Sequence, residues 1–287
     1  MKVFTESDFK AGKIPEKDIF PKALDDFEKS CVLNKDGTIR DGVYGGFLYG
    51  SSARGEANSA SDLDYFLVVK GAGHLWEIRR ATQEVYDDHG VVVQKRVLTL
   101  EEAQKGHHSL QINFFNHLLM AKKSYGHHGQ DPIEILKLND EDIKKAVRET
   151  LCHYLDRLVT GYVSDVDEKS HARLLETILN KPMYCMREMI QFSLEGPIEK
   201  DGQFVDDFEG VRDLFFDCYP KRDLLKKIMA IKNLRQEYTG LLEERLKKGF
   251  NGDLESRNKK IDETILYNHK TAVEIVKACL GLTAVLN

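Results

Sequence analysis

The sequence predicts an α+β N-terminal domain, a small mixed sheet with flanking helices, followed by an all-α helical domain. Two observations indicate this fold class. Strand-like apolar runs occur only in the first part of the chain, at residues 43–49, 62–69 and 91–97. After residue 133 the apolar residues recur only at helical spacing. The break at Asp131-Pro132 therefore separates expected domains at residues 1–130 and 131–287.

The helices of the N-terminal domain have local signals. Pro21 lies near the start of the first, in which Leu24, Phe27 and Cys31 recur at helical spacing. Thr99 and Glu102 form a capping-box pattern after the third strand. The longer helices are expected at residues 21–33, 74–88 and 110–125.

The C-terminal domain is predicted to consist of four or more antiparallel helices with short connections. Pro182 is expected to kink or split the second of them, because proline removes a backbone donor inside a helix. The helical periodicity covers residues 143–162, 172–193, 222–247 and 257–280.

Composition limits the classes of function. Among 287 residues, 41% are hydrophobic and 31% charged, and the net charge is −5. A nucleic-acid substrate would therefore need a local basic patch, because the chain as a whole is not basic. Five scattered cysteines, a polar start and the lack of a long apolar run predict a cytoplasmic protein with no membrane partner. Two histidine pairs, at 107–108 and 127–128, are expected to be solvated rather than metal ligands.

The residues best suited to binding a metal ion or a phosphate lie between the first two strands and at the start of the second. Side chains alternate along a strand, so Asp62 and Asp64 project on one face with Cα atoms about 6–7 Å apart. Two carboxylates so placed suit one or two hard cations. Gly50 permits a close ligand approach, and Ser51 and Ser52 supply hydroxyls and backbone donors for a phosphate. This combination is typical of phosphoryl or nucleotidyl transfer.

The spacing also resembles a known family. Tyr49-Gly50-Ser51, ten further residues, and Asp62-Leu63-Asp64-Tyr65 resemble the signature of the polymerase-β-like nucleotidyltransferase superfamily. Arg54-Gly55-Glu56 is similar to the insert of signal-protein uridylyltransferases. The resemblance implies that Asp62 and Asp64 are catalytic and bind two Mg²⁺ ions, and that Gly50 and Ser51 hold the triphosphate of an NTP, with ATP expected. Arg54 is expected either to contact a phosphate or to pair with Glu56.

The sequence departs from the family at the third strand. The family usually adds a third carboxylate there, and the uridylyltransferase-like version would place it near Val92. Residues 90–97 contain no acid. Nearby acids on helices, expected to be surface or capping residues, are Glu84, Asp87, Asp88, Glu101 and Glu102.

The segment from Leu179 to Lys200 loosely resembles the second domain of aminoglycoside nucleotidyltransferases, which implies that the helical domain holds the acceptor. Lys181, on an otherwise apolar stretch of this domain, is expected either to bind the nucleotide triphosphate or to extend to solvent. We therefore expect Mg²⁺-dependent transfer of an NMP from an NTP to a hydroxyl, with release of pyrophosphate. The acceptor would be a small molecule such as an antibiotic, a protein side chain or an RNA 3′ end. The alternative is a catalytically degenerate sensor or scaffold that binds a nucleotide.

Overall fold

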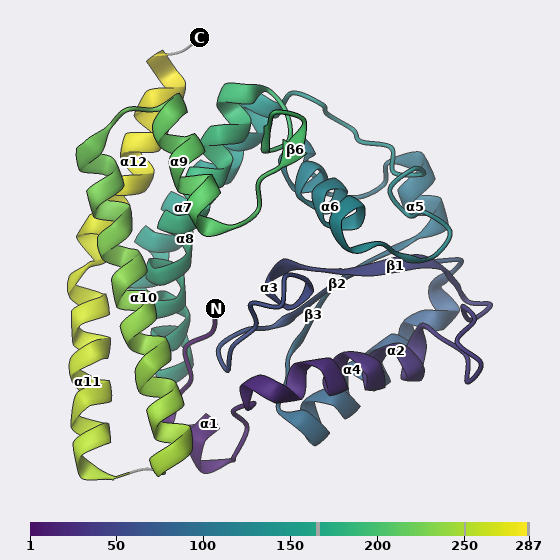
Figure 1. Cartoon of the computed structure of the whole chain (residues 1–287), viewed down its shortest axis with the longest axis horizontal. Coiled ribbons are helices and arrows are strands. Elements are labelled where there is room, and N and C mark those ends of the chain that lie inside the picture. Colours follow the sequence, from purple (N-terminus) through teal and green to yellow (C-terminus); the bar gives the residue numbers. More distant parts are fainter. Residues whose placement is uncertain (165–166, 250, 286–287) are drawn as a thin grey trace. The chain divides into compact units, whose positions relative to one another are not determined.

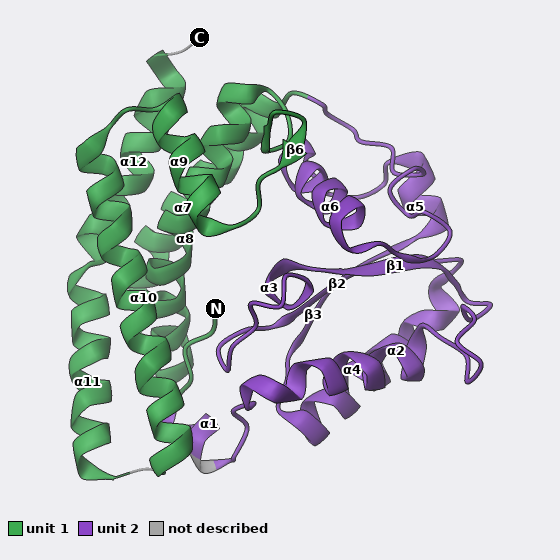
Figure 2. Cartoon of the chain, in the orientation of Figure 1, with its two compact units in different colours: residues 1–5, 142–287 green, residues 6–141 purple. Residues whose placement is uncertain are grey.

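The computed structural model describes residues 1–164, 167–249 and 251–285, apart from the side chain of Lys10. The chain forms two compact units, one of residues 6–141 and one of residues 1–5 with 142–287 (Figure 2). The division predicted from the sequence falls between residues 130 and 131, whereas the units meet at 141 and 142. Residues 131–141 group with the sheet because Ile133 is buried in its core.

The unit of residues 6–141 contains the small mixed sheet that the sequence predicts, with four strands where the sequence indicates three. Its strands follow the order β3-β2-β1-β4. β1 pairs antiparallel with both β2 and β4, whereas β2 and β3 are parallel. The strands are β1 (Val43–Tyr49), β2 (Leu63–Val69), β3 (Val93–Thr99) and β4 (His128–Gly129).

Helices cover both faces of this sheet (Figure 1). On one face, β2 contributes Leu63, Tyr65 and Leu67 to a core with α2 (Phe20–Cys31) and α4 (Leu75–His89). On the other, Phe66 and Val68 pack beneath α5 (Leu100–Lys105) and α6 (Ile112–Tyr125). The alternation of β2 therefore gives it two buried faces. Shorter helices are α1 (Glu6–Lys10), η1 (Lys17–Ile19), α3 (Gly50–Ala53) and η2 (Ala72–His74).

The predicted capping box is confirmed at the start of α5. The hydroxyl of Thr99 accepts a hydrogen bond from the backbone N–H of Glu102, and the Glu102 carboxylate accepts one from the backbone N–H of Thr99. This reciprocal pair satisfies donors that a helix start leaves unpaired. It fixes the turn by which the chain leaves β3.

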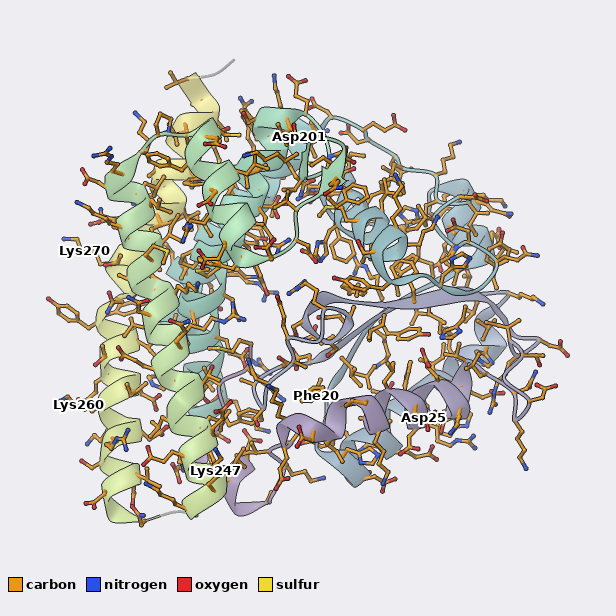
Figure 3. All side chains as sticks on the ribbon, in the orientation of Figure 1. Phe20, Asp25, Asp201, Lys247, Lys260 and Lys270 are labelled. Atoms are coloured by element: carbon orange, nitrogen blue, oxygen red, sulfur yellow. The ribbon has the colours of Figure 1, made fainter. Side chains whose placement is uncertain are left out.

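The second unit is mostly helical, as predicted, with one small hairpin. Its helices are α7 (Ile143–Val163), α8 (Glu168–Leu194), α9 (Phe208–Cys218), α10 (Arg222–Lys248), α11 (Gly252–Tyr267) and α12 (His269–Val285). The hairpin consists of β5 (Glu199–Lys200) and β6 (Gln203–Phe204). The labelled side chains of Lys247, Lys260 and Lys270 extend away from α10, α11 and α12 (Figure 3).

The structure departs from the sequence prediction at two points in this unit. α8 continues through Pro182 as one helix and is not split there, in a stretch where Ile178, Pro182 and Met186 are buried, so tertiary packing outweighs the lost hydrogen bond. The single helix predicted over residues 257–280 is two helices, α11 and α12, that meet at Asn268.

The second histidine of each predicted pair is partly exposed and also has a protein partner. Nδ1 of His108 accepts a hydrogen bond from the backbone N–H of Leu110, and Nε2 of His128 lies 3.1 Å from Oε1 of Glu28. His107 and His127 are exposed, as predicted. Within the described ranges, no helix is long and apolar enough to cross a membrane.

Candidate active site

Asp64 lies in the middle of a row of three side chains across the sheet. It pairs with Tyr49 on β1 and with Gln94 on β3. Residues directly opposite one another in neighbouring strands point to the same face. Asp64 also shares its face with Phe66, two residues along β2, and that face is the one covered by α5 and α6.

Asp62 is held at the entrance to β2 by its neighbours. In the preceding loop, the hydroxyl of Ser61 accepts a hydrogen bond from the backbone N–H of Asn58. The hydroxyl of Ser52 donates to the backbone carbonyl of Asp62 over 3.1 Å. Nε2 of Gln94 donates to Oδ2 of Asp62 over 3.2 Å. Asp62 is therefore held both by the turn after β1 and by β3.

The turn after β1 lies directly against Asp64. Gly50 has φ of +75°, a left-handed conformation that side chains disfavour. A β-carbon at this position would come within 2.2 Å of Oδ2 of Asp64. The glycine thus lets the backbone reach a carboxylate oxygen, and it leaves a cradle that any side chain would fill.

Burial raises the pKa of Asp64 to about 7, and the negative charge of Asp62 acts in the same direction. The positive charge of Arg54 opposes this shift. Two carboxylates that repel each other at the floor of a half-buried site favour a bound cation. Nε of Arg54 lies 2.6 Å from Oε2 of Glu56, so this predicted salt bridge forms. Arg54 is nevertheless close enough to Asp64 for its charge to affect the pKa of that carboxyl group.

The two serines of the turn differ. Ser52 uses its hydroxyl to hold the backbone of Asp62. The hydroxyl of Ser51 forms no hydrogen bond with any residue in the described ranges. Ser51 is therefore the hydroxyl that remains available for a ligand, and Ser52 the one that fixes the start of β2.

α6 supplies an aromatic wall to this site. The ring centroid of Phe114 lies 6.0 Å from that of Tyr49, and the ring of His117 lies 6.1 Å from Tyr49. Asn113 and Asn116 of the same helix are buried, whereas His117 joins the aromatic wall.

Sequence reasoning missed Gln94 and Phe114 as site residues. Gln94 reaches Asp62 only because β2 and β3 pair in one particular parallel register, across 32 positions of sequence. No local motif marks that register. Phe114 adjoins Phe115 between Asn113 and Asn116, and nothing in this local pattern indicates a contact with Tyr49.

Lys181 lies in the other compact unit, on α8. Its ammonium group is 4.6 Å from the ring centroid of Tyr154 and 5.2 Å from that of Tyr184. Burial lowers the pKa of this lysine. These contacts account for its position by cation–π attraction, and a role in nucleotide binding stays a prediction.

The segment that contains the row of Tyr49, Asp64 and Gln94 matches a known family. Residues 37–119 match the family described as the nucleotidyltransferase domain. The match runs from the turn before β1 into α6, and it is consistent with the polymerase-β-like superfamily that the sequence motif resembles. No curated protein matches the chain.

Proposed function

We propose that the chain transfers an NMP from an NTP to a hydroxyl acceptor and releases pyrophosphate, in a reaction that depends on Mg²⁺. The nucleotidyltransferase domain supports NMP transfer in general. The observation that carries the fuller proposal is the approach of Gly50 to Asp64, with Asp62 beside it. A phosphate cradle next to paired carboxylates is what transfer at a phosphorus atom requires.

The donor set fits Mg²⁺. Asp62 and Asp64 supply carboxylate oxygens, and Mg²⁺ is commonly held by one or two carboxylates together with substrate phosphates and water. Within the described residues, no three histidine, cysteine or acidic side chains gather into a complete metal site. The substrate triphosphate would therefore complete the coordination. When bound, the metal neutralises charge on the leaving pyrophosphate and polarises the attacking oxygen.

The chain's own residues bind and orient the reactants. Gly50 admits the phosphates to within reach of the backbone, and the free hydroxyl of Ser51 donates to a phosphate oxygen. Gln94 holds the Asp62 carboxylate in one orientation through its amide. The acceptor oxygen forms a bond to the α-phosphorus as the bond to the β-phosphate oxygen breaks. Pyrophosphate leaves and the acceptor proton passes to solvent.

One observation favours the alternative of a sensor that binds nucleotide without turnover. β3 carries Gln94 next to Asp64 and has no acid. A site with two carboxylates in place of three retains a cation but has fewer groups to accept a proton. The intact pair of aspartates, and the cradle beside them, favours the enzyme.

Labelled substrates separate the two functions. The protein is incubated with Mg²⁺ and each α-labelled NTP, alone and with RNA or a cell extract, and label transfer is followed. We expect a labelled acceptor and release of pyrophosphate. Asp62→Ala and Asp64→Ala should each slow transfer by roughly 10³-fold or more. Circular dichroism checks that both variants fold. A wild type that binds Mg-NTP but labels no acceptor supports the sensor, and a variant that transfers at the wild-type rate refutes the assigned site.

A further inference from the structure

The two sides of the carboxylate pair are different. The Gly50 turn approaches Asp64 from the β1 side, and β3 lies on the opposite side of β2. In nucleotidyl transfer the attacking and leaving oxygens lie roughly in line across the phosphorus. If the triphosphate occupies the Gly50 turn, its leaving group lies toward β1. The acceptor hydroxyl must then arrive over β3.

β3 presents donors on this side. Gln94 pairs with Asp64, and Arg96 pairs with Phe66, so both project on the face of the carboxylates. Both side chains are exposed. β3 is also the last strand of the sheet as described, which leaves this edge open to a large acceptor. Its seven residues, Val93–Thr99, include no acid.

Arg96 lies at the end of the aromatic wall. Its guanidinium carbon is 6.0 Å from the ring centroid of Phe114, the ring that also contacts Tyr49. Nη2 of Arg96 lies 3.4 Å from the hydroxyl oxygen of Ser109. Arg96 forms no ion pair with any residue that the structure describes. A flat ring thus supports one face of the guanidinium while its charge stays uncompensated.

His108 adds a second polar group beside this arginine. Its Nε2 is buried and makes no hydrogen bond to any residue in the described ranges. Burial lowers the pKa of His108, and the charge of Arg96 lowers it further. A lowered pKa favours the neutral imidazole, so His108 adds little positive charge beside Arg96.

We propose that Arg96, with the hydroxyl of Ser109, binds a phosphate group of the acceptor close to the hydroxyl that receives the NMP. The proposal rests on the proposed function. The planar guanidinium has donors in a fork that matches phosphate; one of them reaches the oxygen of the Ser109 hydroxyl, which leaves that hydroxyl's own proton for a phosphate oxygen. Such an acceptor is an RNA 3′ end or a small phosphorylated sugar. Both of these acceptors are anionic, whereas a polycationic antibiotic would be repelled by the charge of Arg96.

The site supplies one positive charge, that of Arg96, toward the local basic patch that a nucleic-acid acceptor would need. A net charge of −5 gives no general attraction for RNA. The uncompensated charge of Arg96 therefore has to act at close range, next to an edge strand without acids.

Binding measurements test this without turnover. The full chain with Mg²⁺ is titrated at low salt with a short fluorescein-labelled single-stranded RNA, and separately with ribose 5-phosphate. Arg96→Ala should weaken one or both by about tenfold, which corresponds to about 1.4 kcal/mol. Arg96→Lys keeps the charge without the fork and should fall between wild type and Arg96→Ala. If only RNA responds, the acceptor is a polynucleotide, and if only ribose 5-phosphate responds, it is a small ester.

Arg79→Ala is the matched control. Arg79 is an exposed arginine of the same unit on α4, which packs on the opposite face of the sheet. Its removal changes the net charge equally and should alter neither affinity by more than about twofold. The proposal is overturned if Arg96→Ala and Arg79→Ala bind alike, if the wild type binds neither probe, or if the wild type binds kanamycin and Arg96→Ala binds it more tightly.

A separate titration with Mg-ATP distinguishes the two proposals. If the wild type binds Mg-ATP and Asp64→Ala does not, the nucleotide site is in place, whatever Arg96 does. If neither protein binds any Mg-NTP, the proposed function fails, and the acceptor site fails with it.

Discussion

Gly50 lies so close to Asp64 that a β-carbon at position 50 would be 2.2 Å from Oδ2 of the Asp64 carboxylate. This contact joins the end of β1 to β2 next to one register pair, Tyr49 with Asp64. Backbone and carboxylate share a space that no larger residue allows. The close contact between Gly50 and Asp64 should affect both the free energy of unfolding and the affinity for NTP, and the two effects can be measured separately.

Gly50→Ala should destabilise the protein and abolish NTP binding. Alanine at φ of +75° is strained, and its methyl group would collide with Asp64. Gly55→Ala separates these causes, because Gly55 has φ of +70° but a β-carbon there would meet nothing within 4 Å. Denaturant unfolding should show the strain in both variants, about 1 kcal/mol or more, with a further loss only at Gly50. If Gly50→Ala and Gly55→Ala lose the same stability and both bind NTP normally, Gly50 does not form a phosphate cradle.

The stability of the metal-free protein should fall as the pH rises from about 4 to about 7. The pKa of Asp64 is raised from its ordinary value of 3.8 to about 7 in the fold. Between these values the native state binds the proton more tightly than the unfolded chain, so raising the pH removes stability, and above about 7 the loss is complete. Each pKa unit corresponds to about 1.4 kcal/mol.

Asp64→Asn should remove this pH dependence. With EDTA present, the variant and the wild type should be similarly stable near pH 4, and the variant should be the more stable near pH 8. Denaturant titrations across this range measure the difference. Mg²⁺ should raise the melting temperature of the wild type more at pH 8 than at pH 5, because it competes with the proton for the carboxylate. A difference between the two proteins that is independent of pH would show that Asp64 does not titrate as stated.

Ser51 and Ser52 should respond differently to the same substitution. Ser51→Ala should weaken NTP binding and leave the melting temperature unchanged, because its hydroxyl has no partner in the described ranges. Ser52→Ala should lower stability by about 1 kcal/mol, since it removes the hydrogen bond to the carbonyl of Asp62. Thermal unfolding and ATP titration on each variant suffice. If Ser51→Ala binds ATP as tightly as the wild type, the phosphate role of Ser51 is wrong.

Local chemistry explains what the sequence predicted well. Thr99 and Glu102 are three residues apart, so their capping box depends on nothing outside one turn. The glycine-serine turn and the two aspartates likewise lie within a 15-residue stretch that alternation and glycine geometry describe. Long-range pairing explains what it missed. Gln94 reaches Asp62 through the parallel register of β2 and β3, and Phe114 reaches Tyr49 through the packing of α6 on β1.

The helical unit shows the same division. The continuous helix through Pro182 depends on burial against neighbouring helices, which outweighs a local rule. The end of α11 at Asn268 is marked by neither glycine nor proline, and the helical spacing of apolar residues continues past it. The sequence pattern therefore predicts one helix where the structure has α11 and α12.

The last prediction concerns the acid that β3 lacks. The nearby acids already have structural partners in four of five cases. Glu84 lies 3.5 Å from Arg80, Asp87 3.2 Å from Lys13 and Glu101 2.7 Å from Lys105, and Glu102 caps α5. Replacing any one of these, or Asp88, by the matching amide should therefore cost transfer less than about 10²-fold, the low end of what a positioned general base contributes.

Gln94→Glu is the complementary change, because it places a third carboxylate beside Asp62, where the amide now donates. Mg²⁺ should bind this variant about tenfold more tightly than the wild type, and without metal the variant should be less stable at pH 8, since three like charges then share the site. Calorimetric Mg²⁺ titration and EDTA denaturation measure the two effects. If instead one of the five acids proves as indispensable as Asp62, that residue is the third ligand, and the metal site extends beyond the row of Tyr49, Asp64 and Gln94.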